Sequence, residues 1–241
     1  SLPHLPFKYP TVMLSRHSLI LTVIASFGIS FIDCAAKEGG NIILQFLSFP
    51  KAVDPKPVEL VVGEGKTIKV EIPTNTLSKT YTVKRQGVWA VGATGVDEKQ
   101  KSVFNVFGQA ESLASSKQLI LLVRKGENNA DGMDVIPIDN DTANFGGGKF
   151  LFMNATKVDI AGEAGGVKFA IKPGESTIIK PQAVSNDQAS EEMFSFREGN
   201  EAKPFFSSKW PISDKSRSLI FFYNDPTSQR LRMHSIRDFI R

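Results

Sequence analysis

Apolar and polar residues alternate in short stretches along most of the chain from Lys37 onward, and the stretches end at Gly, Pro, Asn or Asp. In Ile68–Ile72 the polar residues Lys69 and Glu71 separate the apolar ones, and Val167–Ile171 repeats the pattern. A period of two residues places successive side chains on opposite faces of a β-strand. These stretches therefore predict half-buried strands.

Two apolar runs lack this alternation, Leu119–Val123 and Leu219–Tyr223. A short run that is apolar at every position predicts a strand with both faces buried. Long amphipathic helical patterns are missing, although Gln109–Ser116 is compatible with one or two helical turns. We therefore expect an all-β protein beyond Lys37.

The two halves of the chain resemble each other. Four segments match in the same order: Phe46–Lys51 with Phe152–Lys157, Val58–Ile68 with Val167–Ile178, Ser115–Ile120 with Asp214–Ile220, and Ile138–Asp139 with Ile236–Asp238. Similarity at a nearly constant offset is the signature of repeated structural units, so we infer an internal duplication.

The duplication predicts two tandem antiparallel β-sandwich domains of immunoglobulin-like or cupredoxin-like design. Residues 37–145 form the first domain and residues 149–241 the second, joined by a flexible glycine linker at 146–148. Each half has about a hundred residues, the usual size of such a sandwich. One larger sandwich or barrel with coincidental similarity is the alternative, and the motifs of the chain point to no characterised family.

A secretory signal peptide, forming a helix, is predicted in residues 1–36. The fifteen uncharged residues Ser18–Ile32 follow Arg16 and precede Asp33–Ala36, whose small residues suit cleavage after Ala36. The uncharged run is shorter than the roughly 18–20 residues of a membrane span. We expect export to the periplasm or the extracellular space, without membrane attachment after cleavage.

Three alternatives remain for this segment. It would serve as an uncleaved anchor, or the true start would be Met13, with the preceding residues outside the protein. A lipoprotein would carry its lipid on Cys34, although Asp33 stands where such sites normally have a small residue.

Composition removes several kinds of chemistry. With 29 Lys+Arg against 25 Asp+Glu, the formal charge of +4 is too balanced to require nucleic acid as a partner. The chain has one cysteine and three histidines, and cleavage after Ala36 would leave only His234. This excludes cupredoxin-type copper sites, histidine-based zinc sites and cysteine nucleophiles in the mature chain. We expect His234 to face solvent on a strand rather than to form a catalytic triad with Asp238.

Gly63–Thr67 ends like a phosphate-binding loop, but Leu60 stands where that motif needs its first glycine. The segment also joins two strand patterns, so a hairpin turn is predicted.

Oxygen ligands are densest between Glu127 and Asp141. Calcium is the one cofactor considered, and its candidate ligands are Asp131, Asp134, Asp139 and Asp141. Their spacing differs from an EF-hand, and a solvated hairpin loop is the alternative.

Two further groups are candidate ligand-binding residues. Phe206 follows Phe205 directly, so one of these rings is expected to be exposed and to join Trp210 in an aromatic cluster for a sugar ring or a partner protein. The alternative is that these rings pack under a loop or against the first domain. Arg230 and Arg232 lie in the basic C-terminal segment Lys215–Arg241 and would contact anionic polymers or phosphate head groups. Arg217, Arg237 and Arg241 of the same segment are further candidates for such contacts.

These observations predict an exported, non-catalytic binding or structural module without a cofactor. Its partner would be a protein or a cell-surface polysaccharide, with no role for nucleic acid. A carbohydrate- or polyanion-binding accessory protein is the first alternative, and a hydrolase that uses carboxylates alone is the second.

Overall fold

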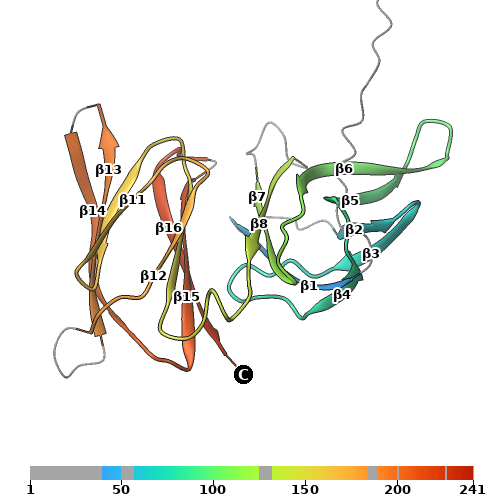
Figure 1. The fold of residues 1–241 in the computed structure, drawn as a ribbon. Helices are drawn as coiled ribbons and strands as arrows, with labels where there is room; N and C mark the ends of the chain where they lie inside the picture. Colours follow the sequence, from blue (N-terminus) through green and yellow to red (C-terminus); the bar gives the residue numbers. More distant parts are fainter. Residues whose placement is uncertain are drawn as a thin grey trace, which may run out of the picture. The chain divides into compact units, whose positions relative to one another are not determined.

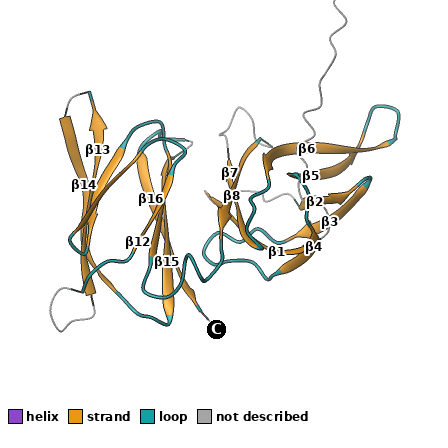
Figure 2. Ribbon diagram, viewed as in Figure 1, coloured by secondary structure: helices purple, strands orange, loops and turns teal. Residues whose placement is uncertain are grey.

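The structure is a computed structural model that describes residues 40–49, 57–124, 132–183, 189–199, 201–225 and 227–240. The predicted signal peptide lies outside the described residues. Within them the chain forms sixteen β-strands and no helix, which confirms the all-β prediction (Figures 1 and 2). The predicted helical turns at Gln109–Ser116 are wrong, because this segment begins inside a strand and continues without helix.

The first eight strands form two four-stranded sheets. Sheet A has the order β4 (Tyr81–Lys84), β1 (Asn41–Phe49), β7 (Lys117–Arg124), β8 (Met133–Asp139). Sheet B has the order β3 (Lys66–Val70), β2 (Val58–Gly63), β5 (Val88–Val96), β6 (Ser102–Glu111). Neighbouring strands are antiparallel except for β1 and β7, which are parallel.

The last eight strands repeat this arrangement. Sheet C has the order β12 (Ser176–Ile179), β9 (Phe150–Ala155), β15 (Ser216–Asn224), β16 (Leu231–Phe239). Sheet D has the order β11 (Val167–Ile171), β10 (Ile160–Ala164), β13 (Ala189–Glu198), β14 (Glu201–Pro211). Each strand of the first half therefore has an equivalent eight strands later, and β9 and β15 form the equivalent parallel pair. Purely antiparallel sheets were predicted, so the two parallel pairs are a correction.

Strand register supports the internal match. Phe46 lies opposite Ile120 in β1 and β7, and Phe152 lies opposite Ile220 in β9 and β15. These are the residues that the sequence comparison aligned. A β-bulge also follows equivalent residues, Val91 in β5 and Phe194 in β13.

One predicted match is wrong. Gly63–Thr67 joins β2 to β3 as the predicted hairpin, with Gly65 at a φ of 64°. Val167–Ile178 instead covers β11 and part of β12. The turn equivalent to Glu64-Gly65 is Gly165-Gly166, between β10 and β11, because each pair of residues closes a two-strand hairpin at the same place in its half.

Buried apolar residues form three clusters. The first core, between sheets A and B, contains Ile42, Leu44, Phe46, Val58, Leu60, Val70, Val83, Trp89, Val91, Ile120, Leu122, Met133 and Val135. The second core, between sheets C and D, contains Phe150, Phe152, Ile160, Ala164, Ile171, Ile179, Phe194, Ile220 and Phe222. The junction core contains Leu47, Phe49, Leu119, Leu121, Ile138, Phe145, Leu151, Met153, Leu219, Phe221 and Ile236, and so joins sheets A and C.

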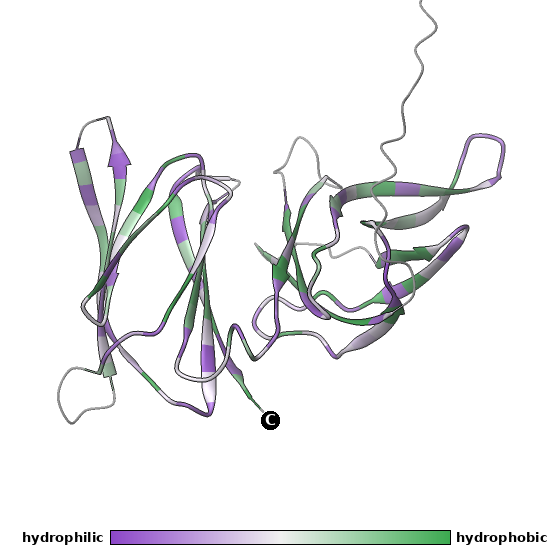
Figure 3. Cartoon of the chain, viewed as in Figure 1, coloured by the Kyte–Doolittle hydropathy of each residue, from purple (hydrophilic) through white to green (hydrophobic). Residues whose placement is uncertain are grey.

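The junction core explains the two uninterrupted apolar runs. In β7, Ile120 belongs to the first core while Leu119 and Leu121 belong to the junction core. Strand β15 divides its residues between the second core and the junction core in the same way. Both strands are buried on both faces, as predicted. Strand β14, in contrast, carries hydrophobic and hydrophilic residues, and none of them is fully buried (Figure 3).

The glycine run between the halves is a packed connection. A Cβ atom at Gly147 would lie 1.8 Å from the Asp214 carbonyl oxygen, so only glycine fits there. The Gly148 amide donates to the carbonyls of Ser213 and Ser216 at 3.0 and 2.9 Å. The prediction of a loose linker at 146–148 is therefore wrong, and the connection holds the start of β9 against the turn before β15.

Candidate functional site

Phe206 and Trp210 lie on β14 and point into the second half. The Phe206 ring stacks on Phe194 with 5.3 Å between centroids, and the Trp210 ring lies 5.8 Å from both Phe150 and Phe194. Both side chains are half-buried and pack against the second core. The two rings also lie 5.5 Å from each other, so they form the predicted aromatic pair, and binding of a sugar ring or a partner protein by this pair stays a prediction.

Arg230 and Arg232 are on a different face of the second half. Leu231 and Met233 of β16 pack against the second core, so Arg232 between them points to the opposite face of sheet C. Arg230 lies in the turn before the strand, where its carbonyl accepts a hydrogen bond from Asp225. The structure therefore does not bring Phe206 and Trp210 to one surface with Arg230 and Arg232, and binding by these residues stays a prediction.

The predicted calcium ligands are separated along β8. Asp134 is near its start and Asp139 at its end, about 17 Å apart for five residues of strand. Asp139 accepts hydrogen bonds from the Asp141 amide and the Asn144 side chain, at 3.0 and 2.8 Å. Asp131 lies outside the described residues, which contain no group of three His, Cys, Asp or Glu suited to a metal. Calcium binding stays a prediction, although Asp134 and Asp139 do not share a site.

His234 is half-buried and contacts the first half, whereas a solvent-facing histidine was predicted. Its Nε2 lies 2.7 Å from the Thr74 carbonyl oxygen, and because a carbonyl only accepts, Nε2 carries the proton. The ring also lies 6.1 Å from Phe49. The predicted alternation is right, with Leu231 and Met233 on the other face, but the face of His234 is covered by the first half.

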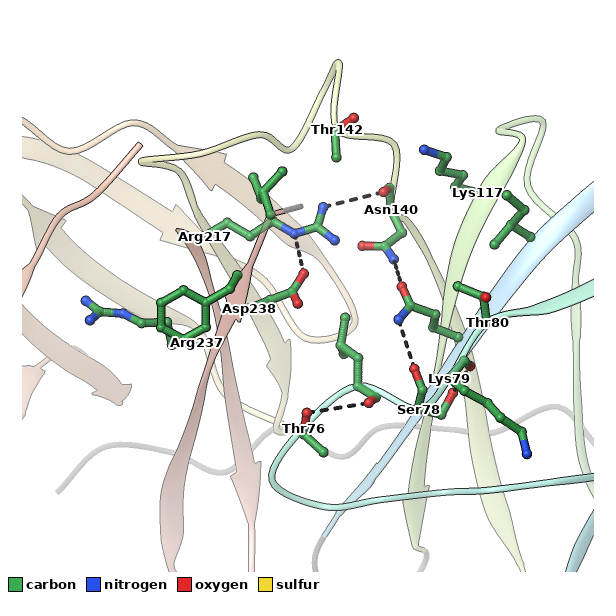
Figure 4. Close-up of a pocket in the computed structure, with 15 residues that line it drawn as sticks. Thr76, Ser78, Lys79, Thr80, Lys117, Asn140, Thr142, Arg217, Arg237 and Asp238 are labelled. Carbon is green, nitrogen blue, oxygen red and sulfur yellow. Dashed lines mark hydrogen bonds and ion pairs between the residues drawn. The ribbon is translucent and has the colours of Figure 1, made fainter. Parts of the chain in front are cut away.

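A cleft of about 720 Å³ lies where the two halves meet (Figure 4). We call it the junction cleft. Its lining from the first half is Ile43, Gln45, Thr76, Leu77, Ser78, Lys79, Thr80, Lys117, Asn140 and Thr142, and from the second half Arg217, Arg237, Asp238, Phe239 and Ile240. The lining comes from strands β1, β7, β15 and β16, from the loop Thr76–Thr80 before β4 and from the loop that follows β8.

Arg217 is the central charge of the junction cleft. Strand register places it opposite Asp238, and its Nε donates to Asp238 Oδ2 at 2.8 Å. Its Nη1 donates to the carbonyls of Phe145 and Asn140 at 2.8 and 3.4 Å, and the guanidinium lies 4.6 Å from the Phe145 ring centroid. Only 5% of the side chain is exposed. An arginine of the second half thus holds the loop that ends the first half.

Three polar residues of the first half form a chain beside Arg217. The Asn140 Nδ2 donates to Gln45 Oε1 at 3.0 Å, and the Gln45 Nε2 donates to the Ser78 carbonyl at 2.9 Å. The Ser78 hydroxyl accepts from the Phe46 amide at 2.8 Å. These bonds fix the two amides at the base of the junction cleft, so the site is built before any ligand arrives.

The lining carries four basic residues and one carboxylate, so its charge favours an electron-rich ligand. Lys79 pairs with Glu71 at 2.8 Å, which raises the pKa of the lysine through a hydrogen bond. The Arg237 Nη2 donates to the Pro211 carbonyl at 2.6 Å. Figure 4 shows the side chains of Lys79 and Arg237 extending away from Asn140. Arg217 and Lys117 are therefore the basic residues on the Asn140 side of the junction cleft.

The sequence did not identify Gln45 as a site residue. It placed Asn140 among the possible oxygen ligands and Arg217 among the C-terminal arginines that would contact anionic polymers, and it considered Asp238 only as part of a triad. The available signal was the match of 214–220 with 115–120, which places Arg217 just inside a strand. That match concerns equivalence between the halves, whereas the junction cleft depends on contact between them.

Neither a protein-family model nor a curated protein matches the sequence of this chain. Within the part of the chain that the structure describes, no helix has the length and apolar character needed to cross a membrane. The functional argument therefore depends on the geometry of the junction cleft.

Proposed function

We propose that this protein is a non-catalytic binding protein whose ligand occupies the junction cleft. The observation that carries the proposal is a cleft lined by both halves, in which buried hydrogen bonds hold Arg217, Asn140 and Gln45 in one orientation. Ligand sites concentrate at such interfaces and use a few oriented polar groups for specificity. Rigid strands on either side supply the scaffold.

A tandem β-sandwich produced by duplication of an immunoglobulin-like or cupredoxin-like unit is part of this proposal. Its support is the repeated strand order, the equivalent parallel pairs and the two sheet-to-sheet cores. Export to the periplasm or extracellular space is proposed from the Ser18–Ile32 segment. The ligand would then belong to a cell-surface polysaccharide or a protein.

We prefer a binding function to a hydrolase because the described lining of the junction cleft has too few carboxylates for hydrolysis. A glycosidase of the common kind uses two of them, about 5–10 Å apart. Among the described residues that line the junction cleft, Asp238 is the one carboxylate, and it accepts a hydrogen bond from Arg217. We therefore propose no catalytic role for these side chains.

The test is a titration of the full chain, followed by amide NMR, with methyl glycosides, small carboxylates and short peptides as probes. We expect at least one class to shift the signals of Lys79, Thr142 and Phe239. Thr80→Trp places a large ring on the exposed Thr80 of the lining and should abolish the shifts. Ser102→Trp, at another exposed residue, which lies in β6 outside the lining, should preserve them. If no probe shifts these signals, the proposal is wrong.

A further inference from the structure

The backbone carbonyl of Ser78 determines the orientation of the Asn140 amide, because Gln45 lies between them and bonds to both. The Ser78 carbonyl only accepts, so the Gln45 NH₂ group must face it. Gln45 therefore presents its oxygen to Asn140, whose NH₂ group must face Gln45. This leaves the Asn140 Oδ1 on the other side, and Figure 4 shows it directed toward Arg217 and Asp238.

Asn140 Oδ1 is buried and has no hydrogen-bond partner among the described residues. Asn140 itself is only 5% exposed. Native proteins rarely leave a buried acceptor without a donor, because the oxygen has lost its hydrogen bonds to water and gained none in return. The base of the junction cleft thus holds an acceptor that lacks a donor among the described residues.

A free donor lies next to this acceptor. The hydrogen bonds of Arg217 to described residues use its Nε and Nη1, and Nη1 reaches the carbonyl of Asn140 itself. Its Nη2 is therefore available to an occupant. Figure 4 shows the Arg217 guanidinium on the side of the Asn140 amide, so this part of the cleft presents both an acceptor and a donor.

We infer that the ligand of the junction cleft is polyhydroxylated, as sugars are, and that one hydroxyl donates to Asn140 Oδ1 while accepting from Arg217 Nη2. This inference rests on the proposed function. A hydroxyl has one donor and two acceptor lone pairs, so a single group satisfies both partners. A carboxylate would satisfy Arg217 but would bring a second acceptor against Asn140 Oδ1.

The remaining lining suits further hydroxyls. Thr76, Thr80 and Thr142 are exposed residues with a hydroxyl group, and Lys117 supplies three N–H donors. Ile43, Leu77 and Ile240 supply apolar surface for the C–H faces of a ring. This mixture of alternating donors, acceptors and small apolar patches matches the surface of a saccharide better than that of a simple anion.

The experiment measures the affinity of the full chain for methyl glycosides of glucose, galactose and mannose by calorimetry, and then for the deoxy and deoxyfluoro analogues of the best binder. Replacing a hydroxyl group with fluorine keeps a weak hydrogen-bond acceptor but removes the hydrogen-bond donor. At one ring position we expect both analogues to bind at least tenfold more weakly, because each leaves Asn140 Oδ1 unpaired. Asn140→Ala should remove the difference between parent and analogues, with folding checked by thermal unfolding.

Three results would overturn the inference. A fluoro analogue that binds as well as its parent at every position shows that no donor is required. If acetate or glycylglycine shifts the NMR signal of Thr142 and the glycosides do not bind, the ligand is not a sugar. The junction cleft then remains a binding site. If no probe shifts the cleft signals and Asn140 Oδ1 holds only ordered water, the proposed function fails as well.

Discussion

Gly108 in β6 and Phe206 in β14 occupy equivalent positions in the two halves. Each lies opposite the last residue before a β-bulge, Val91 in the first half and Phe194 in the second. A Cβ atom at Gly108 would stand 2.2 Å from the Met133 carbonyl oxygen, so glycine allows β6 to lie directly against β8. The ring of Phe206 instead fills the second core against Phe194.

Gly108→Ala should therefore destabilise the protein by about 2 kcal/mol or more, because backbone rather than a movable side chain opposes the new methyl group. Urea unfolding measures the loss. Gly87→Ala is the control, since open space surrounds that position and the change should stay within about 0.5 kcal/mol. Equal effects of the two substitutions would show that β6 and β8 are not in close contact.

The strands and the repeat were predictable from the sequence because they depend on local alternation and on residues of similar kind. Phe46 and Phe152 are both phenylalanine, and their pairing with Ile120 and Ile220 was recovered without coordinates. Positions at which the two halves carry residues of different kinds could not be matched from the sequence, because the match relies on chemical similarity. Glu192, for example, stands where the first half has Trp89, as the registers of β5 and β13 show.

The junction cleft was beyond prediction for another reason. The hydrogen bond between Asn140 and Gln45 joins residues 95 positions apart, and that between Arg217 and Phe145 joins residues 72 apart. No periodicity reports such contacts. The apolar runs in β7 and β15 indicated buried outer faces, but not that these faces cover each other.

Arg217→Met should cost about 3 kcal/mol, because it leaves Asp238 without its cation and two loop carbonyls without their donor. Arg217→Met combined with Asp238→Leu should recover part of the loss, since the unpaired charge is gone. Lys79→Met breaks a solvent-exposed pair of the same cleft and should have no measurable effect. Urea unfolding of the three variants decides the matter, and similar stability of Arg217→Met and Lys79→Met would contradict the central role of Arg217.

Glu192 makes the stability of the second half depend on pH. The side chain is fully buried, the Ser190 hydroxyl donates to its Oε1, and Oε2 has no partner among the described residues. Burial raises the pKa of the carboxyl to about 7. The folded state therefore binds the proton more tightly than the unfolded chain, so this contribution to stability is complete below about pH 4.5 and is lost as the pH rises through 7.

Glu192→Gln removes the carboxyl group that titrates. The free energy of unfolding of this variant, relative to that of the native protein, should rise by about 2 kcal/mol between pH 5 and pH 8. Urea unfolding across that range measures the difference. Glu191→Gln is the matched control, because Glu191 is exposed and lies 3.6 Å from Lys209. Parallel pH profiles for the native protein and Glu192→Gln would mean that the carboxyl is not held in the core.

Either half expressed alone, as residues 37–148 or 149–241, should associate rather than remain monomeric. Separation exposes the junction face of sheet A, with Leu119 and Leu121, or that of sheet C, with Leu219 and Phe221. Apolar faces of this kind drive association in water. Light scattering coupled to gel filtration reports the mass of each half.

The double substitution Leu119→Thr and Leu121→Lys should make the first half monomeric, because it changes residues of the junction core and spares the first core. Ile120→Thr, on the opposite face of the same strand, should instead destabilise the half itself by about 2 kcal/mol or more. If the unaltered halves are monomeric and unfold cooperatively, each is an independent domain, as the sequence repeat first indicated. Association that the double substitution reverses would instead show that the contact between sheets A and C completes the fold and thereby creates the junction cleft.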